Sequence, residues 1–156
     1  MAKELLYKVA YDEAVRARSE QQAVIESFRT RAGLLFSAAA IATSFLGAQA
    51  LRDGRLSLSS WLALLCFVAV ASSSLAVLWP RKWEGVTDPR EVIETYIEAP
   101  EVAPIGELQR DLSIYIYDSY EENRDGLRQL AGLLQVGSAL LTLEIAFWMI
   151  SIAVAY

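Results

Sequence analysis

Three long hydrophobic stretches constrain this chain more than any other feature. They run from Ala32 to Leu51, from Trp61 to Trp79 and from Leu130 to Tyr156, and the third alone contains a charged residue type, Glu144. Each is about as long as the ~20 residues of helix that cross the hydrocarbon core of a bilayer. Because lipid offers no hydrogen-bond partners to the backbone, such segments must be helical. The sequence therefore predicts an all-α fold, an integral membrane helical bundle with three transmembrane helices.

The rest of the composition narrows the possible functions. The chain has 156 residues, of which 54% are hydrophobic, so the three spans leave too few apolar residues for a second core. A formal net charge of −5 argues against binding of nucleic acid. There is no histidine, and the single cysteine, Cys66, lies inside the second span, so the usual general base and metal ligands are missing. We expect no enzyme activity, no cofactor and no metal site.

The spans divide the chain into four segments. The predicted segments are a cytoplasmic N-terminal helix (1–31), a transmembrane hairpin (32–79, with spans 32–51 and 61–79), an acidic cytoplasmic segment with a long helix (80–129) and a third transmembrane helix (130–156). No proline or glycine interrupts residues 1–31, so this helix should continue into the first span. A short helix is expected from Pro89 to Ala99, and the long helix from Ile105 should pack against the N-terminal helix.

The basic residues predict the orientation in a membrane. They precede the first span and follow the second (Arg29, Arg31, Arg81 and Lys82), whereas the link between these spans has only Arg52 and Arg55. Since basic loops stay in the cytoplasm, the N-terminus should be cytoplasmic and the C-terminus external in a bacterial inner membrane. Trp61 and Trp79 are the expected anchors at the two membrane interfaces. Ser59 or Ser60 is expected to cap the second span.

The first span carries a stripe of small residues. Spacings of four and three alternate along it (Gly33, Ser37, Ala40, Ser44 and Gly47), which places these residues on one side of a helix. Small residues let membrane helices approach closely, and close packing drives their association in lipid. Two interpretations remain open: the stripe contacts the other spans of the same chain, or it contacts another subunit.

The third span has two polar sides. Gly137, Glu144 and Ser151 are seven residues apart and share one side, and a second group occupies the other (Gln135, Ser138 and Thr142). An acid at mid-membrane costs on the order of 2.5–3.5 kcal/mol, so Glu144 should face the bundle or water. One interpretation is a protonated Glu144 that bonds to a serine of the first or second span. The other is a ring of Glu144 side chains around the axis of an oligomer.

The order of these parts resembles a known group of membrane proteins. The motif Arg29-Thr30-Arg31-Ala32-Gly33-Leu34-Leu35, the Trp79-Pro80-Arg81 end of the second span and the helix from Leu108 to Gln129 are similar to those of the Pycsar transmembrane and SLATT-type families. Those families belong to bacterial anti-phage systems. Two features depart from their pattern: Arg29 stands where an acidic residue is usual, and no separate nucleotide-sensing domain is visible.

Two functions follow from different observations. The resemblance implies an oligomeric, pore-forming or membrane-disrupting effector whose partners are the lipid bilayer and further copies of the chain. The trigger, a soluble protein or a nucleotide, is left open. The acidic segment from Glu84 to Asp125, in a chain without enzyme motifs, favours instead a membrane anchor that presents its cytoplasmic helices to a soluble partner.

Overall fold

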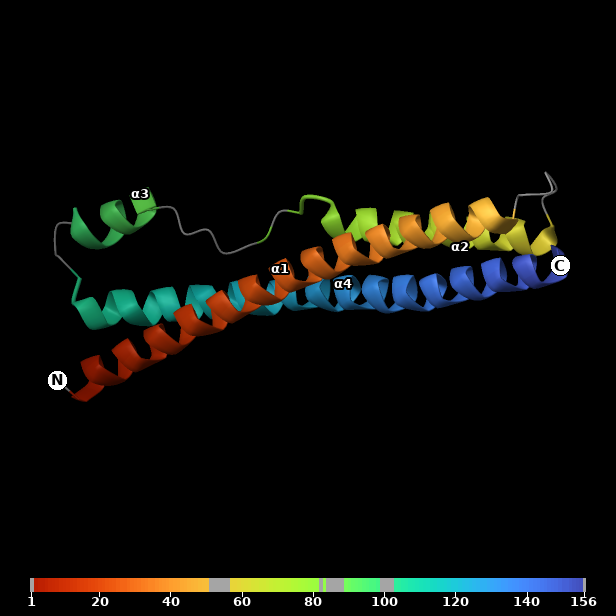
Figure 1. The fold of residues 1–156 in the computed structure, drawn as a ribbon. Coiled ribbons are helices and arrows are strands. Elements are labelled where there is room, and N and C mark those ends of the chain that lie inside the picture. The colour runs from red at the N-terminus through yellow and green to blue at the C-terminus, as the bar shows by residue number, and fades with distance from the viewer. Residues whose placement is uncertain (1, 51–56, 82, 84–88, 99–102, 156) are drawn as a thin grey trace. The chain divides into compact units, whose positions relative to one another are not determined.

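The computed structural model describes residues 2–50, 57–81, 83, 89–98 and 103–155. Within them the chain forms helices in the order α1 (Ala2–Ala50), α2 (Leu58–Leu78), α3 (Pro89–Val92), the π-helix η1 (Ile93–Ile97) and α4 (Ile105–Ala155) (Figure 1). No strand occurs in these ranges, so the predicted all-α fold is confirmed. The polar link predicted around Arg52 and Arg55, and Lys82 after the second span, lie outside the described residues.

α1 and α4 are long, uninterrupted helices, as the sequence predicted. They contain 49 and 51 residues, and the first turn of α4 is held by hydrogen bonds from the Glu107 and Leu108 amides to the Pro104 carbonyl. At 1.5 Å per residue each helix is about 75 Å long, more than twice the ~30 Å hydrocarbon core. Each helix is therefore longer than a single membrane crossing requires.

α2 is capped two or three residues earlier than the sequence suggested. Ser57 is the N-cap, and its side chain accepts a hydrogen bond from the Ser60 amide at 3.2 Å, so the prediction of Ser59 or Ser60 was wrong. The helix ends at Leu78, and the Trp79 amide donates to the Leu75 carbonyl at 2.9 Å. Pro80 follows and cannot extend the ladder, because it has no amide hydrogen.

The short helix predicted from Pro89 is present, with proline in its first turn. It changes from α to π geometry at Ile93 and remains helical to Ile97, while Ala99 lies outside the described residues. The Tyr96 hydroxyl donates to Asp111 Oδ2 at 2.9 Å, which ties this segment to α4.

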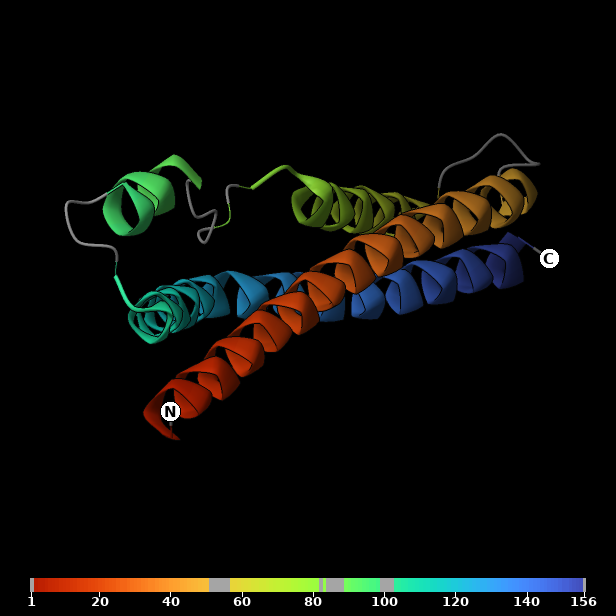
Figure 2. The ribbon, with the colours of Figure 1, turned by 90° about the vertical axis from the view of Figure 1, so that its left-hand side faces the viewer.

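The helices are organised in two compact units. Unit 1 comprises Met1–Ile25 and Arg81–Leu127, and unit 2 comprises Glu26–Pro80 and Arg128–Tyr156. In unit 2, α2 runs beside α1 and α4 and in the opposite direction, as Figures 1 and 2 both show. α1, α2 and α4 are each long and apolar enough to cross a membrane, and their hydrophobic stretches all belong to unit 2.

Unit 1 is held by contacts between α1 and α4. The Gln21 side chain is buried and donates to the Tyr120 carbonyl at 3.2 Å. A Cβ atom built at Gly106 would lie 3.2 Å from the Tyr7 ring, so the two helices also meet near the start of each. The expected packing of the N-terminal helix against the helix from Ile105 is therefore confirmed.

Unit 2 has a narrow core of small side chains. Its wholly buried residues include Ala32, Ala39, Ala63 and Val70, and the largest buried apolar side chains in its described part are Trp148 and Leu130. Long apolar residues such as Phe45, which is 73% exposed, point away from the core. An exposed apolar surface of this kind is expected where the surrounding solvent is lipid.

Candidate functional site

Glu144 is the centre of a buried polar cluster in unit 2. Its side chain is 0% exposed, and its Oε1 accepts a hydrogen bond from Thr43 Oγ1 at 2.6 Å. The same Thr43 oxygen accepts a hydrogen bond from Trp148 Nε1 at 3.2 Å. Glu144 Oε2 is buried and has no hydrogen-bond partner among the described residues. We call these three residues the Thr43–Glu144–Trp148 cluster.

The cluster depends on helical spacing and on one glycine. Glu144 and Trp148 are four residues apart on α4, and Thr43 and Gly47 are four apart on α1, so each pair lies on one side of its helix. A Cβ atom at Gly47 would lie 3.3 Å from the six-membered ring of Trp148. The absence of a side chain at Gly47 therefore makes room for the indole, whose ring nitrogen reaches Thr43.

The predicted polar side of the third span is buried along its whole length. Gly137, Glu144 and Ser151 all face α1 or α2. Ser151 is 2.7 Å from Ser60 Oγ and 3.0 Å from Ser57 Oγ, so its hydroxyl joins the cap of α2. Since 14 residues of helix separate the first and last member by ~21 Å, the three residues form one face but not one site.

The opposite polar side of the third span is exposed. The Ser138 and Thr142 hydroxyls donate to the Leu134 and Ser138 carbonyls of their own helix at 2.8 and 3.1 Å. Gln135 is also exposed, and its amide makes no hydrogen bond within the described part of the chain. Of these three side chains, Gln135 is the one without a hydrogen-bond partner among the described residues.

The position of Glu144 matches one of the two interpretations. Its carboxyl group lies among the helices of its own chain and bonds to a hydroxyl of the first span, although that hydroxyl belongs to a threonine and not to a serine. A ring of Glu144 side chains would require α4 to turn this face outward. Thr43 and Trp148 were not predicted from the sequence as partners of Glu144. The sequence does contain one signal for Trp148: it lies well inside a span, whereas tryptophan prefers the membrane interfaces.

The small stripe of α1 is divided between two environments. Gly47 is buried against Trp148, and Ala40 is half-buried. Ser37 and Ser44 are exposed, and their hydroxyls donate to the Gly33 and Ala40 carbonyls at 2.9 and 2.7 Å. A Cβ atom at Gly33 would meet no other atom of the described residues within 4 Å. Within the described part of the chain, the neighbouring helices therefore cover one end of the stripe and leave the other uncovered.

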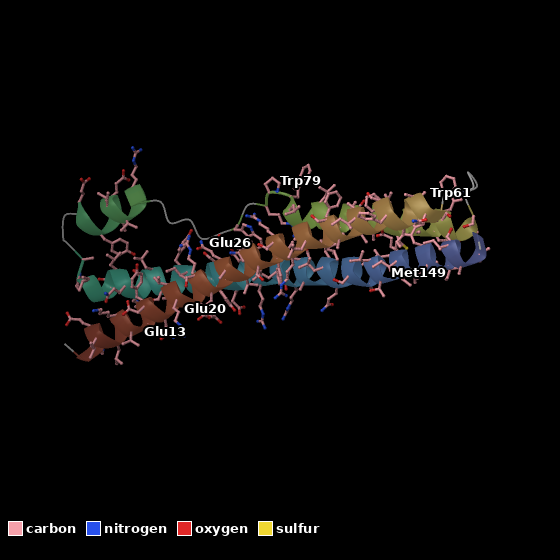
Figure 3. All side chains as sticks on the ribbon, in the orientation of Figure 1. Glu13, Glu20, Glu26, Trp61, Trp79 and Met149 are labelled. Carbon is pink, nitrogen blue, oxygen red and sulfur yellow. The ribbon has the colours of Figure 1, made fainter. Side chains whose placement is uncertain are left out.

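The two predicted interface anchors lie at the ends of α2. Figure 3 shows Trp61 and Trp79 at opposite ends of this helix. Their side chains are 54% and 70% exposed. An exposed tryptophan at each end of an apolar helix is the arrangement that places indole rings at both membrane surfaces.

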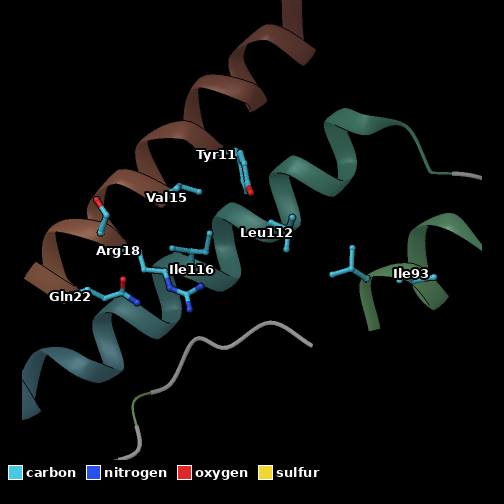
Figure 4. A pocket seen from close by; sticks show the side chains of 9 residues that line it. Tyr11, Val15, Arg18, Gln22, Ile93, Leu112 and Ile116 are labelled. Carbon is cyan, nitrogen blue, oxygen red and sulfur yellow. The ribbon is translucent and has the colours of Figure 1, made fainter. Parts of the chain in front are cut away.

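Each unit also has a groove. The groove of unit 2 has a volume of about 700 Å³ and lies between α1 and α4, with Arg31, Leu34, Gln135 and Ser138 among its lining residues. The groove of unit 1 has a volume of about 680 Å³ and is lined by α1, α4 and the Val92–Ile93 segment (Figure 4). No group of three or more His, Cys, Asp or Glu side chains that could hold a metal ion occurs in the described ranges.

Comparisons with known protein families, curated proteins and solved structures found no match to this chain. The features that bear on function are therefore the polar groups of unit 2 and the uncovered parts of α1 and α4.

Proposed function

We propose that this protein is a self-associating membrane protein that, once assembled, permeabilises a bacterial inner membrane. The supporting observation is the uncovered part of the small stripe, from Gly33 to Ser44. Another helix can approach closely here, because Gly33 has open space beside it and the exposed hydroxyls already bond to their own helix. The orientation, with the N-terminus cytoplasmic and the C-terminus external, rests on the basic residues, and a role in anti-phage defence rests on the Arg29–Leu35 resemblance.

Glu144 supplies the acidic group that would attract cations in the permeable state. An orphaned buried oxygen costs about 1–3 kcal/mol, so a carboxyl group with one such oxygen is a poor packing residue. In the assembled state Glu144 leaves its contact with α1 and faces a shared axis. Several acids at such an axis attract cations, as rings of acidic side chains do in cation channels. In the unassembled chain Thr43 and Trp148 keep the acid covered.

The assembly state tests this proposal. Purified wild-type protein in detergent should form a discrete oligomer in mass photometry. Ser44→Leu should shift it toward the monomer, because a bulky side chain on the uncovered stripe separates the two helices. Phe45→Leu is the matched control. Phe45 is exposed on the same turn of α1, and its replacement by leucine keeps an apolar side chain there. Gly47→Leu is unsuitable, because Gly47 packs against Trp148 within the chain.

A monomer at all protein concentrations would refute self-association. A second function would then be favoured, a membrane anchor that presents unit 1 to a soluble partner. The observation that favours it is the unit 1 groove, where Tyr11, Arg18 and Leu112 surround a concave, mainly apolar surface. An anchor predicts a monomer whose reconstitution into vesicles causes no ion leak, so the assembly and leak measurements together distinguish the two functions.

A further inference from the structure

The groove of unit 2 combines an apolar floor with a charged end. Five residues of each helix line it, between Phe28 and Ala38 on α1 and between Ala131 and Leu141 on α4. We propose that this α1–α4 groove binds one anionic phospholipid, with the phosphate at Arg31 and an acyl chain along the leucines.

The length of the groove fits one leaflet. Each helix advances by ten residues along the groove, from Phe28 to Ala38 on α1 and from Ala131 to Leu141 on α4. At 1.5 Å per residue this is about 15 Å. This is half of the ~30 Å hydrocarbon core, so the groove follows one acyl chain from the headgroup level toward the bilayer centre. The lining residues beyond Arg31 on α1 are Leu34, Leu35 and Ala38, which are all apolar.

Arg31 provides the complementary charge. It is the charged residue among the groove lining, it is exposed, and it immediately precedes the uncharged stretch of the first span. A guanidinium group can hold two phosphate oxygens at once and keeps its charge near a membrane. Basic pockets between membrane helices are known binding sites for anionic headgroups. The groove therefore has an anion-binding end at the level of the headgroups.

Gln135 is the second polar group of the site. It lines the groove four residues after Ala131, and its amide lacks a hydrogen-bond partner among the described residues. An amide without a partner is costly in hydrocarbon. The ester carbonyl oxygens of a phospholipid lie just below its phosphate and can accept this hydrogen bond. Ser138 needs no such partner, because its hydroxyl bonds to the Leu134 carbonyl.

A lipid fits this groove better than a second copy of the chain does. The three spans of a second copy contain one acid, Glu144, and that acid is buried in its own chain. It cannot neutralise Arg31 without unpacking. The groove side of α1 also lies about 150° around the helix from the small stripe, so lipid binding and self-association use different surfaces.

Lipid retention by the full chain tests the proposal. The purified protein in detergent is mixed with phosphatidylglycerol or with phosphatidylcholine of the same acyl composition. Native mass spectrometry should detect one retained phosphatidylglycerol in preference to phosphatidylcholine. Arg31→Gln should weaken that retention about fivefold, the factor equivalent to ~1 kcal/mol for one basic residue at a membrane surface. Arg29→Gln is the matched control, because Arg29 is exposed on the same helix but does not line the groove.

A third variant tests the acyl chain. Ala38→Phe fills the groove from an exposed position and should reduce retention of both lipids. Equal retention of the two lipids by wild type, or equal losses in Arg29→Gln and Arg31→Gln, would refute a specific site. Loss of a dimer in Ala38→Phe without any lipid retention in wild type would show that a second copy occupies the groove. Self-association through Ser44 is measured separately, so either proposal can fail alone.

Discussion

Replacing Thr43 by valine should uncouple α1 from Glu144 without changing the shape of either helix. The substitution removes one hydroxyl group, which donates to Glu144 at 2.6 Å and accepts from Trp148 at 3.2 Å. Both partners are 0% exposed, so neither can turn to water instead. The variant therefore leaves a carboxyl group and an indole N–H buried without partners.

The expected loss follows from these two bonds. Hydrogen bonds between membrane helices contribute about 0.6 kcal/mol on average and at most about 1.7 kcal/mol. Two such bonds, both part-buried and one of them short, give a loss of about 1–3 kcal/mol in the free energy of unfolding. The double variant Thr43→Val/Glu144→Leu should lose less unfolding free energy than the two single variants added together. The difference should be about 0.6–1.7 kcal/mol, because both single variants remove the same Thr43–Glu144 hydrogen bond.

Unfolding in mixed micelles titrated with sodium dodecyl sulfate, followed by tryptophan fluorescence, measures these differences. Ser44→Ala is the matched control, because the neighbouring hydroxyl is exposed and bonds only to the Ala40 carbonyl of its own helix. It should change the unfolding free energy by less than about 0.5 kcal/mol. Equal losses in Thr43→Val and Ser44→Ala, or a coupling below about 0.3 kcal/mol, would show that Thr43 does not hold Glu144.

Three further predictions concern packing, conduction and orientation. Gly137→Ala should lower the unfolding free energy by about 1–2 kcal/mol, because the new Cβ atom would lie 2.7 Å from Leu35 Cδ2. Gly132→Ala should raise it by about 0.5–1 kcal/mol, because the new Cβ atom meets no atom of the described residues within 4 Å. Glu144→Gln should preserve the oligomer and alter cation leak from vesicles, and identical leak in both proteins would favour the anchor. Tyr156→Cys should react with an impermeant thiol reagent only from outside the cell, and cytoplasmic labelling would contradict three spans with a cytoplasmic N-terminus.

The helices of this chain are predictable because their causes are local. Hydropathy and length identify the spans, and the absence of proline and glycine before Arg31 explains the continuity of α1. The cap of α2 was missed because Ser57, Ser59 and Ser60 are all suitable capping residues. Only the conformation of the chain entering the helix decides that Ser57 accepts the Ser60 amide.

The partners of Glu144 are not predictable by the same means. Thr43 and Glu144 are 101 residues apart in sequence, and their contact depends on the axial offset and rotation between two helices. Hydrophobic periodicity describes the faces of one helix and contains no information about that offset. The division of the small stripe has the same origin, since the position of Trp148 decides that Gly47 is covered while Ser44 is exposed.

The way unit 2 satisfies its polar side chains distinguishes structural from functional residues. Hydroxyls such as those of Ser44 and Thr142 bond to carbonyls of their own helix, which costs little and requires no neighbour. The buried Ser74 hydroxyl has no partner among the described residues, but it is uncharged and can rotate toward its own helix. Glu144 and Gln135 differ from these hydroxyls, because neither the second carboxyl oxygen nor the side-chain amide has a hydrogen-bond partner among the described residues. Their cost is explained if each meets its partner in another state or another molecule: cations at an oligomer axis for Glu144, and a lipid ester for Gln135.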